Sequence, residues 1–250
     1  MKYSFLIPYH KRVSLFNNTL ISFSHWYNNR TDFEVVIGVD QKTWSDKNEK
    51  DSLLTLLDKQ FPFKIKYLEV HGFPNTYNPS AAFNLCAKEA EGKYFVITNP
   101  ECFHNNNVLS EIDNFLNVSN EDYYFVCSCE NGIVEKNPID KFEEFSYKHH
   151  SWYQHSKYRN LCYHFCSIIS KENYNKIGGF DERFMDGIAY DDDDFKEKIS
   201  YHGIKIVPID TTLVIHQHHP PEIYSAPDRG KRIAHNKNLY EANQRERARK

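Results

Sequence analysis

The sequence predicts one α/β domain, with a Rossmann-like, mostly parallel central sheet, helices on both faces and a small antiparallel addition. Over residues 3–98, short apolar runs typical of strands alternate with helical patterns. Parallel strands need long crossover connections, so this alternation is typical of right-handed βαβ units. The length of 250 residues is also sufficient for one large domain with its own core.

The first half of the chain supplies these units in order. Strands are predicted where β-branched and aromatic residues gather, over 3–7, 33–39, 63–70 and 94–98. Helices with one apolar face are predicted between them, over 12–27, 46–57 and 80–90. The first strand is expected to end at Pro8 and the fourth at Asn99-Pro100, because proline has no N–H for a central ladder.

The second half is less regular. Strands are predicted over 123–129, 161–169, 204–207 and 213–215. A short helix is expected before the Gly178-Gly179 turn, and another over 194–201. The breaker-rich segment 71–79 is predicted to be a loop, while 131–160 has no clear period and receives no assignment.

Composition excludes several classes of protein. The 31 basic side chains against 34 acidic ones give a net charge of −3, which does not indicate nucleic-acid binding. No apolar run approaches the roughly 20 residues that span a bilayer, and residues 1–11 do not resemble a signal peptide, so a cytoplasmic protein is expected. The six cysteines are then expected to be reduced thiols. A zinc site with His164 is an alternative that their spacing does not favour.

Polar residues follow three of the predicted strands at their carboxyl ends, where open α/β sheets bind ligands. They are Tyr9, His10, Lys11 and Arg12 after the first strand, Asp40 after the second, and Asn99, Glu101 and His104 after the fourth. Asp40 is suited to accept hydrogen bonds from a base or ribose, and Glu101 to bind a divalent metal. For each residue alone, a helix cap or a turn is the alternative.

An acidic run, Asp191-Asp192-Asp193-Asp194, lies after Gly178-Gly179-Phe180-Asp181-Glu182. Adjacent carboxylates repel one another, so a cation or a ligand is expected to offset their charge. A solvated helix start explains one or two acids but not four, and the alternating ligand pattern of a calcium loop is missing. Asp191 and Asp194 are expected on one helix face and Asp192 on another.

Two further features lie towards the end of the chain. His216 and His218 follow a short predicted strand, and histidine suits a divalent transition metal, although a surface position is an equal alternative. Residues 229–250 hold eight basic and two acidic side chains, a net charge of +6. This basic tail is predicted to be a solvated helix, with peripheral membrane contact as a weaker alternative.

Taken in order, these segments resemble family 2 glycosyltransferases with a GT-A fold. Phe5-Leu6-Ile7-Pro8-Tyr9 resembles the opening strand of that family, and Val36-Ile37-Gly38-Val39-Asp40 the strand that ends in a nucleotide-contacting Asp. Residues 81–94 are similar to its Asn-bearing helix and the strand after it, and Asn99-Pro100-Glu101 falls where the family has its Asp-x-Asp metal motif. Residues 178–195 resemble its Gly-Gly-Phe-Asp-Glu motif and later acidic pair.

The resemblance implies transfer of a sugar from a nucleotide-diphosphate sugar, most simply a UDP-sugar, to a hydroxyl of a glycan, lipid-linked or protein acceptor. It implies an inverting reaction, a catalytic domain over 1–220 with a donor half (1–101) and an acceptor half (102–220), and a tail over 221–250. It implies Asp192 as the base, supported by Asp191, and Mn²⁺ or Mg²⁺ held by Glu101, Asn99 and His216. The implied donor-binding residues are Pro8, Tyr9, His10, Arg12, Asp40, Gln41, Asn84, Asn99 and Pro100, and the implied acceptor-binding residues are Asp191, Gly179 and Phe180.

Three positions depart from the pattern of the family. Asn99 replaces the first Asp of the metal motif, Gln41 replaces a second Asp after the nucleotide strand, and Phe83 stands where an Arg often precedes the Asn. These changes leave open a binding module that has lost turnover. A sugar nucleotidyltransferase is a further alternative, but the first loop lacks the glycines of a phosphate loop. Three basic residues of the tail are candidates to close over the diphosphate: Arg229, Lys231 and Arg232.

Overall fold

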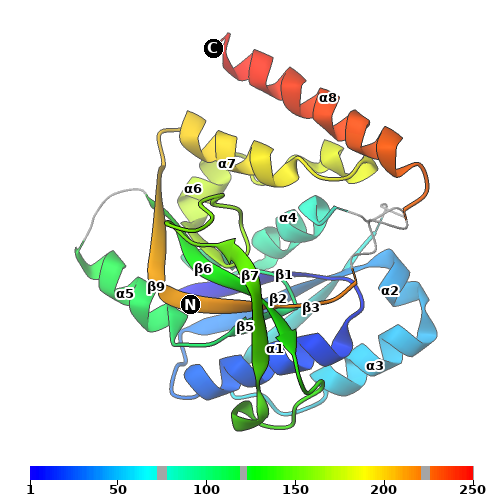
Figure 1. The fold of residues 1–250 in the computed structure, drawn as a ribbon, viewed down its shortest axis with the longest axis vertical. Helices are drawn as coiled ribbons and strands as arrows, with labels where there is room; N and C mark the ends of the chain where they lie inside the picture. The colour runs from blue at the N-terminus through cyan, green and yellow to red at the C-terminus, as the bar shows by residue number, and fades with distance from the viewer. Residues whose placement is uncertain (72–77, 119–122, 221–225, 250) are drawn as a thin grey trace.

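A computed structural model describes residues 1–71, 78–118, 123–220 and 226–249. In these residues the chain forms a nine-stranded mixed sheet with the order β3-β2-β1-β4-β8-β6-β9-β5, and β7 pairs with β6 outside this path. Helices cover both faces of the sheet (Figure 1). Most of the loop predicted over 71–79 and the start of the tail at 221–225 lie outside the described residues.

The N-terminal half is the parallel sheet that the sequence predicts. Its strands are β1 (Tyr3–Tyr9), β2 (Phe33–Asp40), β3 (Lys64–Val70) and β4 (Tyr94–Ile97). One boundary was wrong, because β1 continues through Pro8 and pairs it with Gly38. Pairing with β4 ends at Leu6, so Pro8 stands where β1 has a single neighbour and its missing N–H breaks no central ladder.

The C-terminal half is largely antiparallel. Its strands are β5 (Cys102–His104), β6 (Tyr123–Val134), β7 (Tyr147–Gln154), β8 (Ser167–Ser170) and β9 (Lys205–Gln217), and only β6 and β9 pair in parallel. The predicted strands 204–207 and 213–215 are one strand, because β9 crosses the residues between them with a register shift against Cys127 and Ser128. The unassigned segment 131–160 contains β7, which pairs with the extended end of β6.

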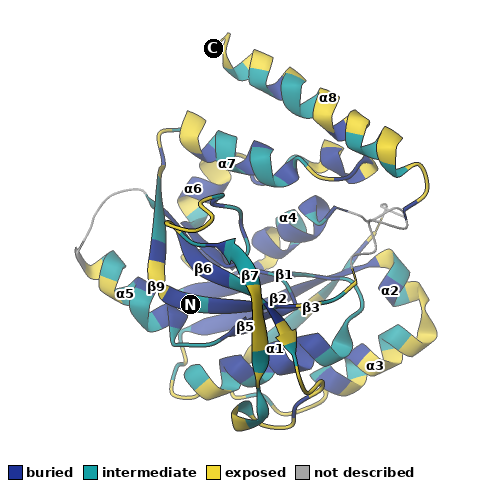
Figure 2. Cartoon of the chain, viewed as in Figure 1, coloured by how far each residue is buried: buried dark blue, intermediate teal, exposed yellow. Residues whose placement is uncertain are grey.

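The helices form two layers. On one face, α1 (Val13–Trp26), α3 (Lys47–Leu57) and α5 (Val108–Val118) bury their apolar sides in the larger core cluster. On the other face, α4 (Ser80–Glu89), α6 (Lys171–Lys176) and α7 (Asp191–Tyr201) pack on a second cluster. The short elements are α2 (Gln41–Ser45) and the 3₁₀ turns η1 (Phe142–Glu144) and η2 (Glu182–Asp186). The inward faces of both layers are buried (Figure 2).

The basic tail forms α8 (Arg229–Arg247), which packs outside α7 and against η2 (Figure 1). Its inner side carries buried polar groups: Asn236 donates to the carbonyls of Phe184 and Ala189, and the Arg247 guanidinium lies 2.7 Å from the carboxylate of Asp194. The prediction of a solvated helix therefore holds for its outer side only, since its inner side is docked on the acidic segment.

All six cysteines are buried and free, and none belongs to a set of potential metal ligands found in the described residues. In the part of the chain that the structure describes, no helix combines the length and apolar character needed to span a bilayer.

Candidate active site

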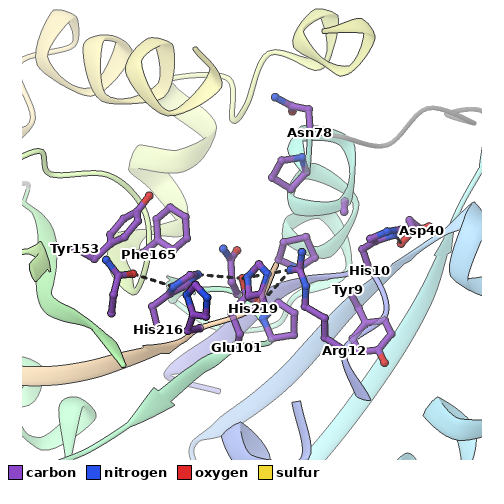
Figure 3. A pocket seen from close by; sticks show the side chains of 18 of the residues that line it. Tyr9, His10, Arg12, Asp40, Asn78, Glu101, Tyr153, Phe165, His216 and His219 are labelled. Atoms are coloured by element: carbon purple, nitrogen blue, oxygen red, sulfur yellow. Dashed lines mark hydrogen bonds and ion pairs between the residues drawn. The ribbon is translucent and has the colours of Figure 1, made fainter. Parts of the chain in front are cut away.

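A cavity of about 640 Å³ lies at the carboxyl ends of β1, β2 and β4 (Figure 3). Its wall includes most of the residues that the sequence places at this edge of the sheet: Pro8, Tyr9, His10, Arg12, Asp40, Asn99, Pro100 and Glu101. The far wall comes from the C-terminal half, with Tyr153, Phe165 and His216. Segments from both halves of the chain therefore meet in one hollow, as expected for an open α/β sheet.

The charged centre of this cavity is the Glu101 cluster, which we define as Glu101, Arg12, His216 and His219. The Nε2 atoms of His216 and His219 lie 3.4 and 3.3 Å from Oε1 of Glu101. Arg12 approaches from the other side, with Nη1 3.4 Å from both carboxylate oxygens. The Glu101 carboxylate is buried and lies between two imidazoles and a guanidinium (Figure 3).

These partners keep Glu101 ionised. Burial alone would raise the pKa of its carboxyl, but the neighbouring imidazoles of His216 and His219 and the charge of Arg12 hold that pKa well below its usual range. Glu101 is therefore a permanent negative charge at the floor of the cavity.

The donor set fits a divalent transition metal. One carboxylate oxygen and two imidazole nitrogens lie within 4.8 Å of one another, and carboxylate with imidazole suits Mn²⁺ and its neighbours. Asn99 lines the same cavity. The sequence missed His219, because alternation along a strand favoured His218 as the partner of His216. The strand ends at Gln217, so alternation no longer applies to the two residues after it.

Asp40 combines the two roles that the sequence left open. It caps α2, since its Oδ1 accepts from the N–H of Thr43 at 3.0 Å, and its Oδ2 lies 2.6 Å from Nδ1 of His10. Burial would raise the pKa of Asp40, but hydrogen bonds from His10 and Thr43 lower it. The carboxylate therefore faces the cavity in its charged form, with its orientation fixed from two sides.

The turn after β1 is strained. Lys11 and Arg12 have φ values of 55° and 65°, in the left-handed region that non-glycine residues enter at a cost of roughly 1–2 kcal/mol each. The turn brings the Arg12 side chain beside Glu101 before α1 begins. Strain of this size persists only where the surrounding structure enforces it, and here it accompanies a charged contact in the cavity.

Next to the cavity lies the His164 trio, which we define as His164, Asp191 and Asp192. Nδ1 of His164 is 2.7 Å from Oδ1 of Asp192, and the three side chains place ligand-type atoms within 4.8 Å. Burial and the charge of Asp192 raise the pKa of Asp191 to about 7, although His164 opposes the shift. Burial would lower the pKa of His164, but the two carboxylates raise it.

The trio adjoins the cavity without being part of its wall. Two cavity residues link them: Asn78 interacts with Asp191, and Tyr153 feels the charge of Asp192 strongly enough to raise the pKa of its phenol further. Phe165, the neighbour of His164 in sequence, also lines the cavity. Asp192 thus lies near the part of the cavity wall that Tyr153 forms.

Several residues implied by the resemblance lie elsewhere. Gln41 is exposed at the start of α2, and Asn84 is bonded to both backbone groups of Phe180. Phe180 is buried between Phe83 and Phe195, with stacked ring centroids 4.7 and 4.0 Å away. None of these is among the described residues that line the cavity.

Gly179 and the basic residues of the tail also lie away from the cavity. A Cβ at Gly179 would lie 2.5 Å from Oδ1 of Asn84, and its φ of 60° favours glycine, so backbone geometry explains this residue. Arg232 donates to the carbonyls of Asp186 and Pro227, and Lys231 is exposed beside Asp228. Neither they nor Arg229 is among the described residues that line the cavity.

Neither a protein-family model nor a curated protein matches the sequence. Solved structures do match its fold. S. aureus TarS 1–349 in complex with UDP-GlcNAc superposes with a TM-score of 0.67 at 14% identity, over 97% of this chain and 66% of that one. This chain has a GT-A glycosyltransferase fold.

Two further structures carry the same fold. S. aureus TarS 1–349 alone gives a TM-score of 0.62 at 17% identity, covering 87% of this chain and 60% of that one. The mannosyltransferase PcManGT from Pyrobaculum calidifontis, in complex with GDP-Man and Mn²⁺, gives 0.58 at 15% identity, covering 92% and 58%. The chain thus spans between two fifths and two thirds of the length of the structures it matches.

Proposed function

We propose that this chain transfers a sugar from a nucleoside-diphosphate sugar to an acceptor hydroxyl, by direct displacement that inverts the anomeric carbon. The observation that carries the proposal is the Glu101 cluster in a cavity of about 640 Å³, with the His164 trio adjoining the wall near Tyr153 and Phe165. A diphosphate leaving group needs positive charge, an attacking hydroxyl needs a base, and this arrangement offers both around one hollow.

The donor end of the cavity is the edge of β1, β2 and β4. Asp40, held by His10, is a fixed acceptor for a base or ribose hydroxyl, and Asn99 adds an amide beside Glu101. Structures with this fold have been solved with UDP-GlcNAc and with GDP-Man and Mn²⁺, which supports a nucleotide sugar here without choosing the base. Gln41, which is exposed outside the cavity, is not needed for this proposal.

Glu101, His216 and His219 would hold a divalent ion, with Asn99 as a further oxygen donor. Such an ion supplies positive charge to the departing diphosphate. Arg12 supplies charge from the protein itself, since its guanidinium already lies at the Glu101 carboxylate. The two histidines lie beside the same carboxylate and orient it towards the cavity.

At the acceptor end, Asp192 is the base that we propose to take the hydroxyl proton. Its side chain is 25% exposed, whereas Asp191 is buried beneath it. A general base in this position contributes on the order of a hundred- to ten-thousandfold to the rate. Asp191 supports this base as its buried neighbour, and the charge of Asp192 helps to raise the pKa of Asp191.

One observation favours a second function. Arg12 already balances the charge of Glu101, so the site could bind a nucleotide sugar without turnover, as a binding module. A panel of UDP- and GDP-sugars with Mn²⁺ separates the two: release of the nucleoside diphosphate supports a transferase. Donor binding measured by calorimetry without any release, with a range of glycan acceptors, supports the module. Absence of binding would contradict both.

A further inference from the structure

His164 is enclosed by aromatic rings, and its only charged neighbours in the described structure are carboxylates. The side chain is 3% exposed, and its ring contacts four phenylalanines at centroid distances of 4.9 to 6.2 Å: Phe83, Phe165, Phe180 and Phe195. An imidazole in such a cage loses its hydration and must recover a polar partner from the protein. Its charged neighbour is Oδ1 of Asp192, 2.7 Å from Nδ1, a contact that is an ion pair and not an aligned hydrogen bond.

Because of this contact, the two carboxylate oxygens of Asp192 have different surroundings. Oδ1 is buried and faces His164, so the exposed quarter of the side chain belongs to its other atoms. Oδ2 is therefore the oxygen that remains available to an acceptor hydroxyl. Because His164 is held by four rings, it fixes the rotation of the carboxylate as well as its position.

The titratable groups around the pair come from four elements. Asp191 and Asp193 flank Asp192 on α7, Tyr124 comes from β6, Tyr153 from β7, and Tyr163 bonds to Asp193 through its hydroxyl at 2.8 Å. The phenols have pKa values that burial raises well above neutral pH, so they stay protonated. Among the groups named here, His164 is the one that can bring positive charge to Asp192.

We propose that His164 is a positioning residue for acceptor activation: its imidazole pairs with Oδ1 of Asp192 and holds that oxygen so that Oδ2 faces the incoming hydroxyl. This inference rests on the proposed transfer function. In the step, the acceptor oxygen forms a bond to the anomeric carbon as its proton moves to Oδ2. The bond from that carbon to the diphosphate breaks, and its electron pair leaves with the diphosphate. His164 keeps its Nδ1 proton throughout.

Two variants of the full chain separate this role from simple packing. His164→Phe keeps the aromatic volume and removes the polar contact with Asp192, whereas His164→Asn keeps an amide N–H that can approach Oδ1 of Asp192. We expect His164→Phe to lower kcat by about tenfold or more with the donor KM unchanged, because the base loses its orientation. His164→Asn should recover a large part of that loss although it fills less space.

A measurement that does not need turnover keeps the inference separate from the proposed function. NMR of isotope-labelled histidine should give a His164 signal whose pKa lies above the ordinary histidine value, and Asp192→Asn should lower that pKa. Failure to see this coupling removes the pair and overturns the inference. If the coupling is seen but the wild-type chain transfers no sugar, the proposed function is overturned, and the positioning role is overturned with it.

The remaining kinetic outcomes also decide the matter. Equal kcat values for wild type and His164→Phe overturn the inference, with fold checked by thermal melting and donor binding by calorimetry. A loss in His164→Phe that His164→Asn does not recover, with both variants folded, shows a packing role and overturns it as well. Only loss in the first variant with recovery in the second supports it.

Discussion

The Glu101 cluster and the His164 trio shift the pKa of a buried carboxyl in opposite directions. Each buries a carboxyl beside imidazole, and in each case burial pushes the pKa of the carboxyl up. Glu101 nevertheless has a pKa well below its usual range, while Asp191 reaches about 7.

The neighbours explain the difference. Glu101 faces Arg12 and two histidines, which are groups that can donate to a carboxylate, and it has no second carboxylate among these partners. Asp191 faces a second carboxylate, and the single histidine beside them is shared with Asp192. The excess of donors keeps the Glu101 carboxylate ionised, as a metal ligand must be, and the excess of carboxylates makes the trio a place where a proton can be gained and lost.

The largest expected effect is at the trio. Asp192→Asn should lower kcat by roughly a hundred- to ten-thousandfold, because the amide cannot accept the hydroxyl proton. Donor affinity should stay near the wild-type value, since the Glu101 cluster is untouched. Transfer assays with calorimetry check both parts. Full transfer by this variant would remove Asp192 from the role of base.

The two sites differ in how much of their geometry could be predicted from the sequence. Asp40, Glu101 and Arg12 could be predicted to meet, because each ends or follows a parallel strand and the carboxyl ends of such strands share one edge. His164 could not, because the strand predicted over 161–169 begins only at Ser167 and the partner of His164 is on α7.

The second half of the fold was harder to predict for a related reason. Strands β5 to β9 pair across long sequence distances and mostly antiparallel, so no local pattern gives their order. The sequence also gave no sign that α8 docks on the acidic segment. Its inner contacts are made by asparagines, Asn236 and Asn243, which resemble surface residues in a sequence with a net charge of +6.

A smaller but still large effect is expected at the Glu101 cluster. Glu101→Gln removes the fixed charge, so donor affinity in the presence of Mn²⁺ should fall about ten- to a hundredfold, as for loss of a charged contact of roughly 1.5–3 kcal/mol. Calorimetry with and without a chelator checks this. Glu130→Gln is the matched control, since Glu130 contacts Tyr147 and His149 instead. An affinity that chelation does not change, in wild type and variant alike, would contradict metal binding here.

The His164 trio should also make the free energy of unfolding depend on pH. Asp191 ionises near pH 4 in the unfolded chain but at about 7 in the folded one, so between these values only the folded state holds the proton. Its contribution to the free energy of unfolding is therefore greatest at low pH and decreases as the pH rises towards 7. Asp191→Asn should flatten this decline and be more stable than wild type at neutral pH by roughly 1–3 kcal/mol. Denaturant unfolding across this pH window tests it, and a slope equal to that of wild type would mean that Asp191 is ionised throughout.

The smallest effect is expected at Asp193, which follows Asp191 and Asp192 in the sequence but has a different hydrogen-bond partner. Asp193 is half-buried and accepts a hydrogen bond from the hydroxyl of Tyr163 at 2.8 Å, a bond that an asparagine oxygen can also accept. Asp193→Asn should therefore change the free energy of unfolding by less than about 1 kcal/mol and leave kcat within about twofold of wild type. Run beside Asp192→Asn, it tests whether position or charge matters in the acidic run. If removing either acid slowed transfer equally, the total charge of the run would be the cause, and the contact of Asp192 with His164 would no longer explain the site.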